Sequence, residues 1–396
     1  MYSTKRLRLL LIRLSWPIFY SVLAALVVGF LLFFRLPSLV PGFSASEVAV
    51  RASAFSVHTI IKNPLNAPYK AALLCLLKLH HHGALAMRGI SALIGVLIVA
   101  LFYYVLSHWY TRRVALLGSA LLVSSSWFLH YARLADPGIL YGLPVIALAY
   151  GTWLRITKRS GLALFVGAAL MALLMYIPGL VCLLVAGGVW QSRALYQHLK
   201  RQPLLGVLAF LFGFTLLLPL GYGLLLHPSL LRTFVGLPAH TWPTPLSILK
   251  NIGSLPYQFI IRGHVNPVVN LSNLPILDIF TLAMASLGVY AFYFQRRLHR
   301  AQLLFGASIV GIVLVALGGP VTTVILLPFV YIFAAGGMSL MLQQWFTVFP
   351  RNPLAAIIAT TLLSIAVVIT GFYHVNRYFI AWPNAPATKQ TFYQKP

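Results

Sequence analysis

Residues 88–107 read RGISALIGVLIVALFYYVLS, a stretch with one charged side chain, Arg88, at its start. An α-helix of about 20 apolar residues is long enough to cross the roughly 30 Å of hydrocarbon in a bilayer. The apolar residues are continuous and do not alternate with polar ones, as they would in a strand of a membrane barrel. The stretch therefore predicts a membrane-spanning helix.

Comparable apolar runs recur along the whole chain. Of its 396 residues, 60% are hydrophobic and 8% are charged, and the mean hydropathy is +0.89. Soluble domains carry about 25% charged residues. The composition therefore predicts an all-α polytopic membrane protein. We expect about 11 crossings, at approximately 15–34, 88–107, 114–130, 138–155, 161–175, 178–191, 204–226, 275–294, 302–318, 321–342 and 354–374.

The net charge of +26 comes from 29 basic and 3 acidic residues. Nucleic-acid binding is the less economical interpretation, because the basic residues are densest in the short segments on one side of the predicted topology. Arg112–Arg113 and Arg296–Arg297 are examples. Short cytoplasmic loops of membrane proteins are enriched in Lys and Arg. We therefore expect an inner or plasma membrane protein with a cytoplasmic N-terminus, an extracytoplasmic C-terminus, membrane lipids as partners and no nucleic-acid partner.

The N-terminal segment resembles a secretory signal, since basic residues between Lys5 and Arg13 precede an apolar run that reaches Phe34. The apolar core of a signal peptide is about 7–15 residues long. This run is longer, so it predicts an uncleaved first span.

Two outer segments are long, approximately 35–87 and 227–274. The apolar residues between Ala45 and Ile61 recur at spacings of three and four, which predicts one helix lying in the membrane interface. A second short helix is expected from Pro68 to about His80. We treat 1–374 as one transmembrane domain and 375–396 as a short extracytoplasmic tail.

The three acidic residues, Glu47, Asp136 and Asp278, all fall at the outer side of this topology. Each has a structural interpretation. Glu47 completes a capping box with Ser44 and is spaced to pair with Arg51. Asp136 precedes a proline and suits a helix N-cap, and Asp278 lies in the first turn of a span, where the helix dipole favours negative charge.

A functional interpretation treats Glu47 and Asp136 as a pair. A carboxylate at the interface can bind a sugar hydroxyl and act as a general base. Outer arginines, among them Arg51, Arg88 and Arg133, could hold a leaving phosphate through charge-assisted hydrogen bonds. The alternative for these arginines is contact with lipid headgroups by long side chains whose charged ends reach the interface.

Several motifs occur in the order that one membrane enzyme family shows. PGFSASEVAV (41–50) stands where that family has an acidic pair after its first span, and residues 84–141 form an arginine-started span, a basic turn and a third span before an acidic loop. Later come IIRGHVNPVVNLSNLPILD (260–278) and VILLPFVYIFAAGGM (324–338). The chain resembles the GT-C glycosyltransferases, specifically the protein O-mannosyltransferase and aminoarabinose transferase family (glycosyltransferase family 39-like), over about residues 15–375.

This resemblance implies a GT-C-type helical bundle with interfacial helices in the first outer loop. It also implies transfer of a sugar from a polyprenyl-phosphate donor to a lipid, glycan or protein acceptor on the extracytoplasmic face. The catalytic candidates are Glu47 and Asp136. The substrate-binding candidates are Arg51, Arg88, Arg133, Arg262 and His264.

The chain departs from the family pattern at four places. Ser46 stands at the usual Asp of the acidic pair, and His264 replaces an acid in the outer loop. Asp136 precedes Pro137, whereas the family acid follows the proline. Thr322 and Thr323 stand where relatives often have an arginine for phosphate.

Two other functions stay open at this point. The departures are compatible with an impaired GT-C homologue that binds lipid-linked sugar or acts as a scaffold. A transporter or flippase is less favoured, because transporters place ionisable residues near the bilayer midplane and these acids lie at the boundary. No cofactor is required, although a divalent metal is possible. The histidines His80–His82 have no second ligand group at zinc spacing.

Overall fold

The computed structural model describes residues 21–79, 83–156, 161–192, 202–263, 265–350 and 352–393, together with 196 and 200. The predicted first span begins partly outside these residues, and so does the signal-like segment before it. Among the described residues, six helices are long and apolar enough to cross a membrane. They are α5 (Ala84–Trp109), η1 with α8 (Pro137–Gly142 and Pro144–Ile156), α12 (Pro203–Leu226), α16 (His299–Ala316), η2 with α17 (Thr323–Leu326 and Leu327–Val348) and α18 (Pro353–Asn376).

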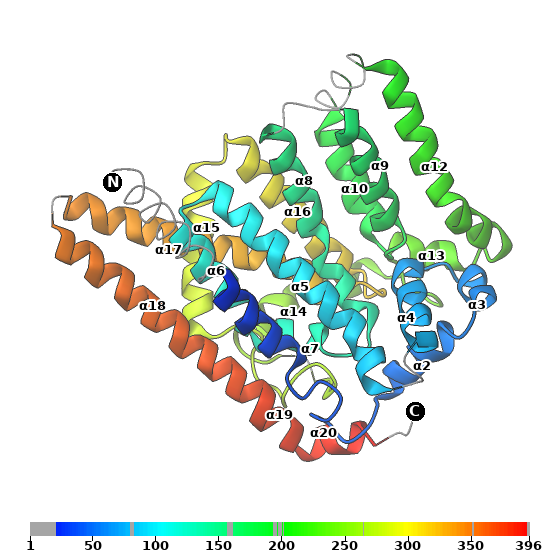
Figure 1. The fold of residues 1–396 in the computed structure, drawn as a ribbon, viewed down its shortest axis with the longest axis horizontal. Helices are drawn as coiled ribbons and strands as arrows, with labels where there is room; N and C mark the ends of the chain where they lie inside the picture. The colour runs from blue at the N-terminus through cyan, green and yellow to red at the C-terminus, as the bar shows by residue number, and fades with distance from the viewer. Residues whose placement is uncertain are drawn as a thin grey trace, which may run out of the picture.

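A further candidate span is bent, and four apolar helices are shorter. The bent pair is α6 (Arg112–Ser124) and α7 (Ser126–Ala132), whose axes differ by 63°. The shorter helices are Ser21–Phe33, α9 (Gly161–Met175), α10 (Leu180–Trp190) and α15 (Ile279–Phe294). The chain is a multi-pass, all-helical membrane protein (Figure 1). Every predicted span coincides with one of these helices, while the count of about 11 crossings and their orientation stay predictions.

The bend between α6 and α7 lies at Ser125. This residue is extended (φ −63°, ψ 135°), and its side chain accepts a hydrogen bond from Phe128 N at 3.1 Å. Serine competes with the helix for backbone donors in this way, so one residue ends α6 and caps α7. After this bend, the segment that follows α7 contacts the first outer loop, where Ala135 N donates to Glu47 Oε1.

The first outer segment contains three helices rather than the two expected. Residues 45–61 were predicted to form one helix, and this is wrong. They form α2 (Ala45–Ser53) and the start of α3 (Val57–Lys62), because Ser56 is extended and caps α3 through Thr59 N. The second predicted helix is confirmed as α4 (Ala67–Leu79).

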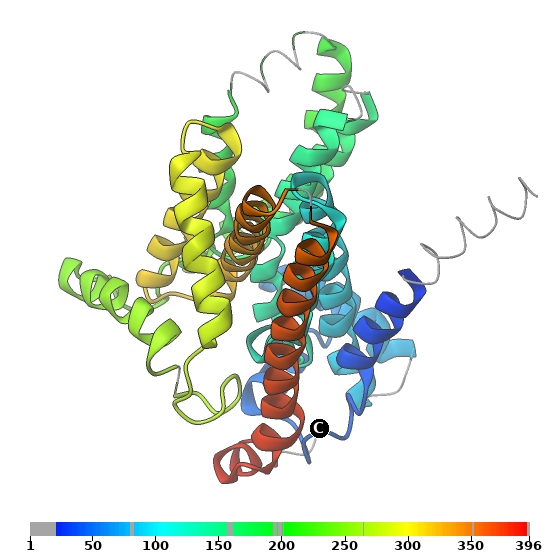
Figure 2. The same cartoon turned by 90° about the vertical axis from the view of Figure 1, so that its left-hand side faces the viewer.

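The second outer segment contains α13 (Leu230–Val235) and α14 (Pro245–Ile260). Helix α14 is amphipathic, and its apolar residues Leu246, Leu249 and Tyr257 are exposed and do not face the protein core. Figure 2 shows α14 (yellow-green) leaning out from the bundle. An apolar face directed away from the protein suits a helix in the membrane interface.

The C-terminal residues pack against the two outer segments. After α18 the chain continues through η3 (Arg377–Ala381), α19 (Trp382–Asn384) and α20 (Pro386–Thr391). Trp382 and Phe392 are buried, and Trp382 Nε1 donates to Pro267 O at 2.8 Å. Both views place α19 and α20 at the end of the molecule that holds α2. The described part of 375–396 is therefore a folded element of that end.

Helices α15 and α17 approach each other closely through glycines. A Cβ added at Gly288 would lie 1.7 Å from Phe333 O, and one at Gly337 would lie 2.0 Å from Met284 O. Small residues allow such close backbone contact between membrane helices. Helix α17 of this pair also packs against α6 and α18.

Candidate functional site

Glu47 is completely buried at the start of α2. Ser44 N donates to Glu47 Oε2 at 3.0 Å, and Glu47 N donates to Ser44 Oγ at 3.3 Å. The predicted capping box is therefore confirmed. Ser46, at the family's usual Asp position, is half-buried and its Oγ lies 3.0 Å from Ser44 Oγ.

The partner of Glu47 is Arg88, which lies 41 residues further along the chain. Arg88 Nε donates to Oε1 at 2.9 Å, and an Nη donates to Oε2 at 3.1 Å. The predicted pairing of Glu47 with Arg51 is wrong, because Arg88 reaches both carboxylate oxygens from α5 while Arg51 is half-exposed on the surface of α2. A bidentate pair of this kind is specific in geometry as well as strong.

Arg88 also holds the loop that precedes α2. It donates to Gly42 O at 2.7 Å and to Leu36 O at 3.3 Å, and its side chain is 2% exposed. The phosphate-binding role of Arg88 stays a prediction, and its observed contacts are with Glu47 and this loop. Arg88 thereby joins the first outer loop to α5.

The two candidate acids lie next to each other. Ala135 N donates to Glu47 Oε1 at 3.0 Å, so Glu47 holds the residue that directly precedes Asp136. Asp136 is half-exposed, and its Oδ1 accepts from Gly138 N at 2.6 Å as the N-cap of η1. The N-cap interpretation of Asp136 is confirmed. Glu47 is completely buried, whereas Asp136 is partly buried.

The electrostatic setting of Asp136 differs from that of a free carboxyl group. Burial raises the pKa of Asp136, the Gly138 N–H bond opposes that change, and the Glu47 charge raises the pKa further. A carboxylate with a raised pKa holds a proton more readily near neutral pH, which favours proton transfer.

Gly138 explains why the acid precedes Pro137 in this chain. A Cβ at Gly138 would lie 2.9 Å from Asp136 Oδ1 and 2.9 Å from Cδ1 of the Tyr131 ring. Such contacts are too short for any real side chain, so an acid at position 138 would displace Asp136. The family's order, with the acid after the proline, does not fit here.

Arg133 has an enclosed position comparable to that of Arg88. It is 2% exposed, donates to Leu31 O and to Phe34 O (2.6 Å), and its Cζ lies 4.6 Å from the centre of the Phe379 ring. Carbonyl groups in the last turn of a helix lack partners within that helix. Arg133 therefore anchors the end of helix Ser21–Phe33, and its contact with phosphate stays a prediction.

The other predicted substrate-binding residues are not gathered around Glu47. Arg262 is exposed just after α14. His264 lies outside the described residues, as do His80–His82. Among the residues that the structure describes, no group of three or more His, Cys, Asp and Glu side chains could hold a metal ion.

Sequence reasoning passed over Tyr69 and Lys70, both on α4. Tyr69 Oη lies 2.9 Å from Ser91 Oγ on α5. Burial raises the pKa of Tyr69, against the Ser91 bond, and the charges of Asp136 and Glu47 raise it further. Lys70 Nζ donates to Asn63 O at 2.8 Å, and burial lowers the pKa of Lys70 to about 8. Both residues lie in the helix that the sequence predicts over 68–80. The sequence alone does not show which face of that helix is buried, so it did not single them out.

A second polar cluster joins α7, α15 and α18. Asp278 caps α15 through Thr281 N at 2.9 Å, which confirms its helix-start interpretation. Its Oδ2 also lies 2.9 Å from Nε2 of His374, whose Nδ1 lies 3.1 Å from Ser126 Oγ. This chain of contacts was not predicted, because Asp278 and His374 are 96 residues apart.

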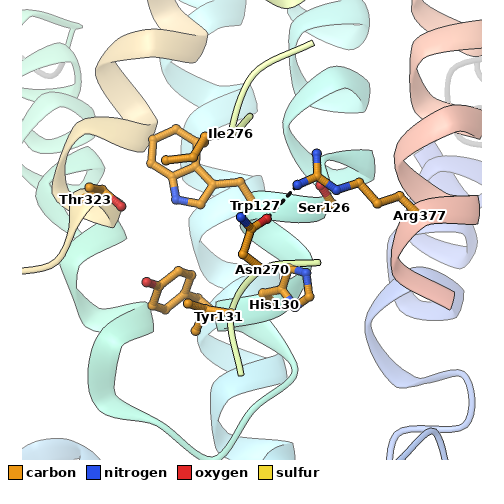
Figure 3. Close-up of a pocket in the computed structure, with 9 residues that line it drawn as sticks. Ser126, Trp127, His130, Tyr131, Asn270, Ile276, Thr323 and Arg377 are labelled. Atoms are coloured by element: carbon orange, nitrogen blue, oxygen red, sulfur yellow. Dashed lines mark hydrogen bonds between the residues drawn. The ribbon is translucent and has the colours of Figure 1, made fainter. Parts of the chain in front are cut away.

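Arg377 ties the C-terminal elements to the second outer segment. It donates to Asn270 Oδ1 at 2.6 Å and to Pro275 O at 2.9 Å (Figure 3). Asn270, the first residue of a glycosylation sequon, is 6% exposed and therefore enclosed. The cavity beside it has a volume of about 20 Å³, room for about one water molecule.

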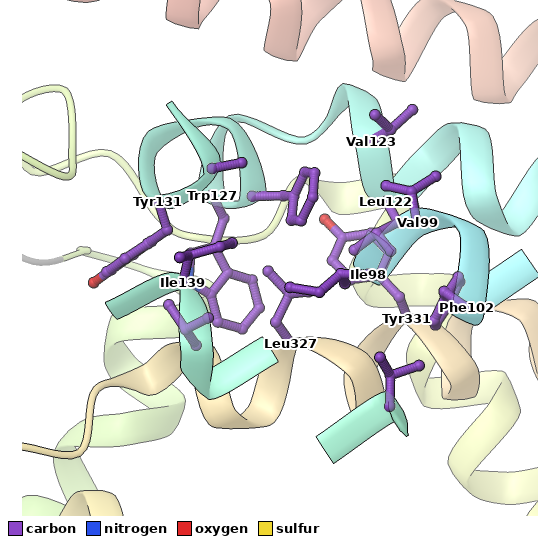
Figure 4. Close-up of a cluster of buried hydrophobic side chains, with 14 of the residues drawn as sticks. Ile98, Val99, Phe102, Leu122, Val123, Trp127, Tyr131, Ile139, Leu327 and Tyr331 are labelled. Atoms are coloured by element: carbon purple, nitrogen blue, oxygen red, sulfur yellow. The ribbon is translucent and has the colours of Figure 1, made fainter. Parts of the chain in front are cut away.

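The walls of this small cavity belong to the apolar core. Trp127 and Tyr131 line it from α7, and both belong to the hydrophobic core that also contains Ile98 of α5 and Leu327 of α17 (Figure 4). A sugar cannot enter a space of this size. The cluster around Asp278 therefore holds helices together, and the pair Glu47–Asp136 remains the candidate site.

Asp278 is expected to contribute stability that depends on pH. Burial alone would raise its pKa, but hydrogen bonds from His374 and Thr281 outweigh burial and hold the pKa below its usual range. A depressed pKa gives stability above the unfolded-state pKa, and this stability is lost as pH falls through the folded-state pKa. Below about pH 4, the wild-type melting temperature should fall more steeply than that of Asp278→Asn. Parallel curves would contradict this.

Comparison with known proteins was made by sequence and by structure. No protein-family model matches the sequence, and no curated protein matches it. The structure matches the crystal structure of ArnT from Cupriavidus metallidurans in the apo state with a TM-score of 0.59 and 15% identity, over 95% of this chain and 78% of that one. It matches the structure of the same protein bound to undecaprenyl phosphate with a TM-score of 0.57 and 16% identity, over 94% and 77%.

The chain has a GT-C-type fold. The match to ArnT, an aminoarabinose transferase, extends over nearly the whole chain, so it includes the outer segments as well as the spans. The fold class expected from the motif order is thereby confirmed. At 15% identity, the structural match shows the fold alone. The roles of individual residues rest on the geometry above.

Proposed function

We propose that the chain is an integral-membrane glycosyltransferase that moves a sugar from a polyprenyl-phosphate donor to an acceptor on the extracytoplasmic face. The observation that carries this proposal is the GT-C fold, shared over 95% of the chain with ArnT, a protein also solved with undecaprenyl phosphate. The adjacent acids at one end of the bundle supply a site for the chemistry.

Asp136 is the reacting carboxylate in this proposal. It accepts the proton of the acceptor hydroxyl while the acceptor oxygen bonds to the anomeric carbon of the sugar. The bond between that carbon and the phosphate oxygen breaks, and polyprenyl phosphate leaves with the bonding electrons. The anomeric carbon gains oxocarbenium character in the transition state. The half-exposed position and raised pKa of Asp136 suit this role.

Glu47 is a positioning residue in the same proposal. The sequence makes it a catalytic candidate together with Asp136, but each of its oxygens already accepts from Arg88. The backbone N–H groups of Ser44 and Ala135 complete its surroundings. Through Ala135 it determines where Asp136 lies. The pair Glu47–Arg88 therefore acts on the reaction through the loop that carries the acid.

The direct test uses the purified full chain in liposomes with undecaprenyl-phosphate sugars radiolabelled in the sugar. Release of undecaprenyl phosphate and transfer of label to lipid, glycan and peptide acceptors are measured. The proposal expects donor consumption that requires an acceptor. Donor binding without turnover on every acceptor would contradict it and favour a lipid-sugar-binding GT-C homologue, the alternative suggested by Ser46. Label crossing the bilayer intact would indicate a flippase.

A further inference from the structure

A second site is suggested by a cavity between the first outer loop and the C-terminal elements. Its volume is about 470 Å³, within the range of small-molecule sites. The loop after helix Ser21–Phe33 forms one wall, and η3, α19 and α20 form the other. The lining residues are Arg35, Ser38, Leu39, Pro41, Phe379, Pro383, Asn384 and Lys389.

This cavity is positively charged. Arg35 and Lys389 enter it from opposite walls, and its lining contains no acidic residue. The three acids of the chain are engaged elsewhere: Glu47 pairs with Arg88, Asp278 contacts His374, and Asp136 caps η1. Two cations with no acidic side chain among the described lining residues favour an anionic ligand.

The wall behind Phe379 contributes a third cation. The guanidinium of Arg133 lies 4.6 Å from the centre of this ring, and it holds Phe34 O at 2.6 Å. The next residue, Arg35, has a left-handed backbone (φ +51°) that arginine seldom adopts. Such a conformation persists where its surroundings enforce it, and it is most frequent at functional sites. Arg133 thus holds the turn that places Arg35 beside the cavity.

An apolar track leads from the cavity along the adjoining helix. Phe30 and Phe34 stack with their ring centres 4.6 Å apart, and they are 56% and 44% exposed. Phe34 also lies 6.1 Å from Phe379 in the cavity wall. The helix Ser21–Phe33 is apolar, and exposed rings on it and just after it suit contact with hydrocarbon. A ligand with an anionic head and an apolar chain fits both surfaces.

We infer that this cavity binds a lipid phosphate, with the phosphate between Arg35 and Lys389 and the hydrocarbon chain along Phe30 and Phe34. The inference rests on the proposed function in one respect, since it names the carrier lipid as the occupant. The site is separate from Arg88, whose donors face Glu47 and the loop carbonyls. The loop over 35–44 connects it to the capping box of α2.

The test measures lipid binding to the full chain in detergent by native mass spectrometry. The probes are undecaprenyl phosphate, undecaprenol, phosphatidylglycerol and inorganic phosphate. The variants are Arg35→Asn, in which asparagine tolerates the left-handed backbone, Lys389→Gln and the double variant. Lys250→Gln, which removes an exposed lysine on α14, is the matched control.

Loss of a charge-assisted hydrogen bond weakens binding by about tenfold. Each single variant should therefore bind undecaprenyl phosphate about tenfold more weakly, and the double variant more weakly still, while Lys250→Gln binds as wild type. Undecaprenol should bind weakly and equally to all. Phosphatidylglycerol bound as tightly as undecaprenyl phosphate would keep the lipid-phosphate site but contradict the carrier lipid as its specific occupant.

Two results would overturn the inference: wild-type affinity of the double variant for undecaprenyl phosphate, or equal affinity of the wild type for undecaprenol. Displacement of the lipid by inorganic phosphate at equal concentration would also contradict the role of the aromatic track. The proposed transferase can fail separately. The wild type could transfer no sugar while substitution of Arg35 and Lys389 still weakens lipid binding. That result would support the binding site and refute only the catalytic proposal.

Discussion

Replacing Asp136 with asparagine is expected to lower sugar transfer by about 10²- to 10⁴-fold, the usual contribution of a general base. Asparagine keeps the acceptor oxygen that caps η1 through Gly138 N. It cannot take a proton from the acceptor hydroxyl. The measurement is the initial rate of label transfer by equal amounts of folded protein in liposomes.

The stability of the same variant separates a lost base from a damaged fold. Because burial raises the pKa of Asp136, the folded state binds its proton more tightly than the unfolded state. Folding stability therefore falls as pH rises from the unfolded-state pKa of Asp136 through its higher folded-state pKa, and it stays lower at higher pH. At neutral pH, Asp136→Asn should melt at or above the wild-type temperature.

Asp278→Asn is the matched control, since it makes the same change at another N-cap carboxylate. It should keep transfer within a few-fold of wild type. If Asp136→Asn retains wild-type rates, or if Asp278→Asn loses as much activity, Asp136 is not the base.

The largest expected effect on stability comes from Arg88→Met. The change leaves the Glu47 carboxylate buried at 0% exposure without its cation, and Gly42 O and Leu36 O lose a donor. Breaking a buried ion pair from one side costs about 3–5 kcal/mol. The free energy of unfolding, measured by denaturant titration in detergent, should fall by this amount.

A double-mutant cycle tests whether the cost arises from the pair itself. Glu47→Gln combined with Arg88→Met removes the unpaired charge, so the double variant should be more stable than Arg88→Met alone. Arg51→Met, which removes a half-exposed arginine from α2, should change stability by less than about 0.5 kcal/mol. A cost for Arg51→Met equal to that for Arg88→Met would show that Arg51 is the true partner of Glu47.

Two predictions failed because they rested on local spacing alone. Glu47 and Arg51 are four residues apart, and local spacing favours their pairing. The actual partner comes from α5, and the choice is made by the bundle, which brings Arg88 to both oxygens. The break at Ser56 likewise ended a helix that apolar spacing alone predicted as continuous.

The sequence alone determined the class of the protein and the local structure at its acids. Long apolar runs require spanning helices, since backbone groups in hydrocarbon must bond within their own segment. The caps at Glu47, Asp136 and Asp278 followed from neighbouring residues, because each is a contact over two or three residues.

The tertiary structure decided which charges are enclosed and which are available. Arg88 and Arg133 read as surface cations in the sequence, yet helix packing directs both at backbone carbonyls inside the fold. It leaves Asp136 half-exposed beside a fully buried Glu47, and it places Lys389 opposite Arg35. Burial depends on neighbours that lie tens to hundreds of residues away along the chain. The local spacing of residues therefore cannot predict it.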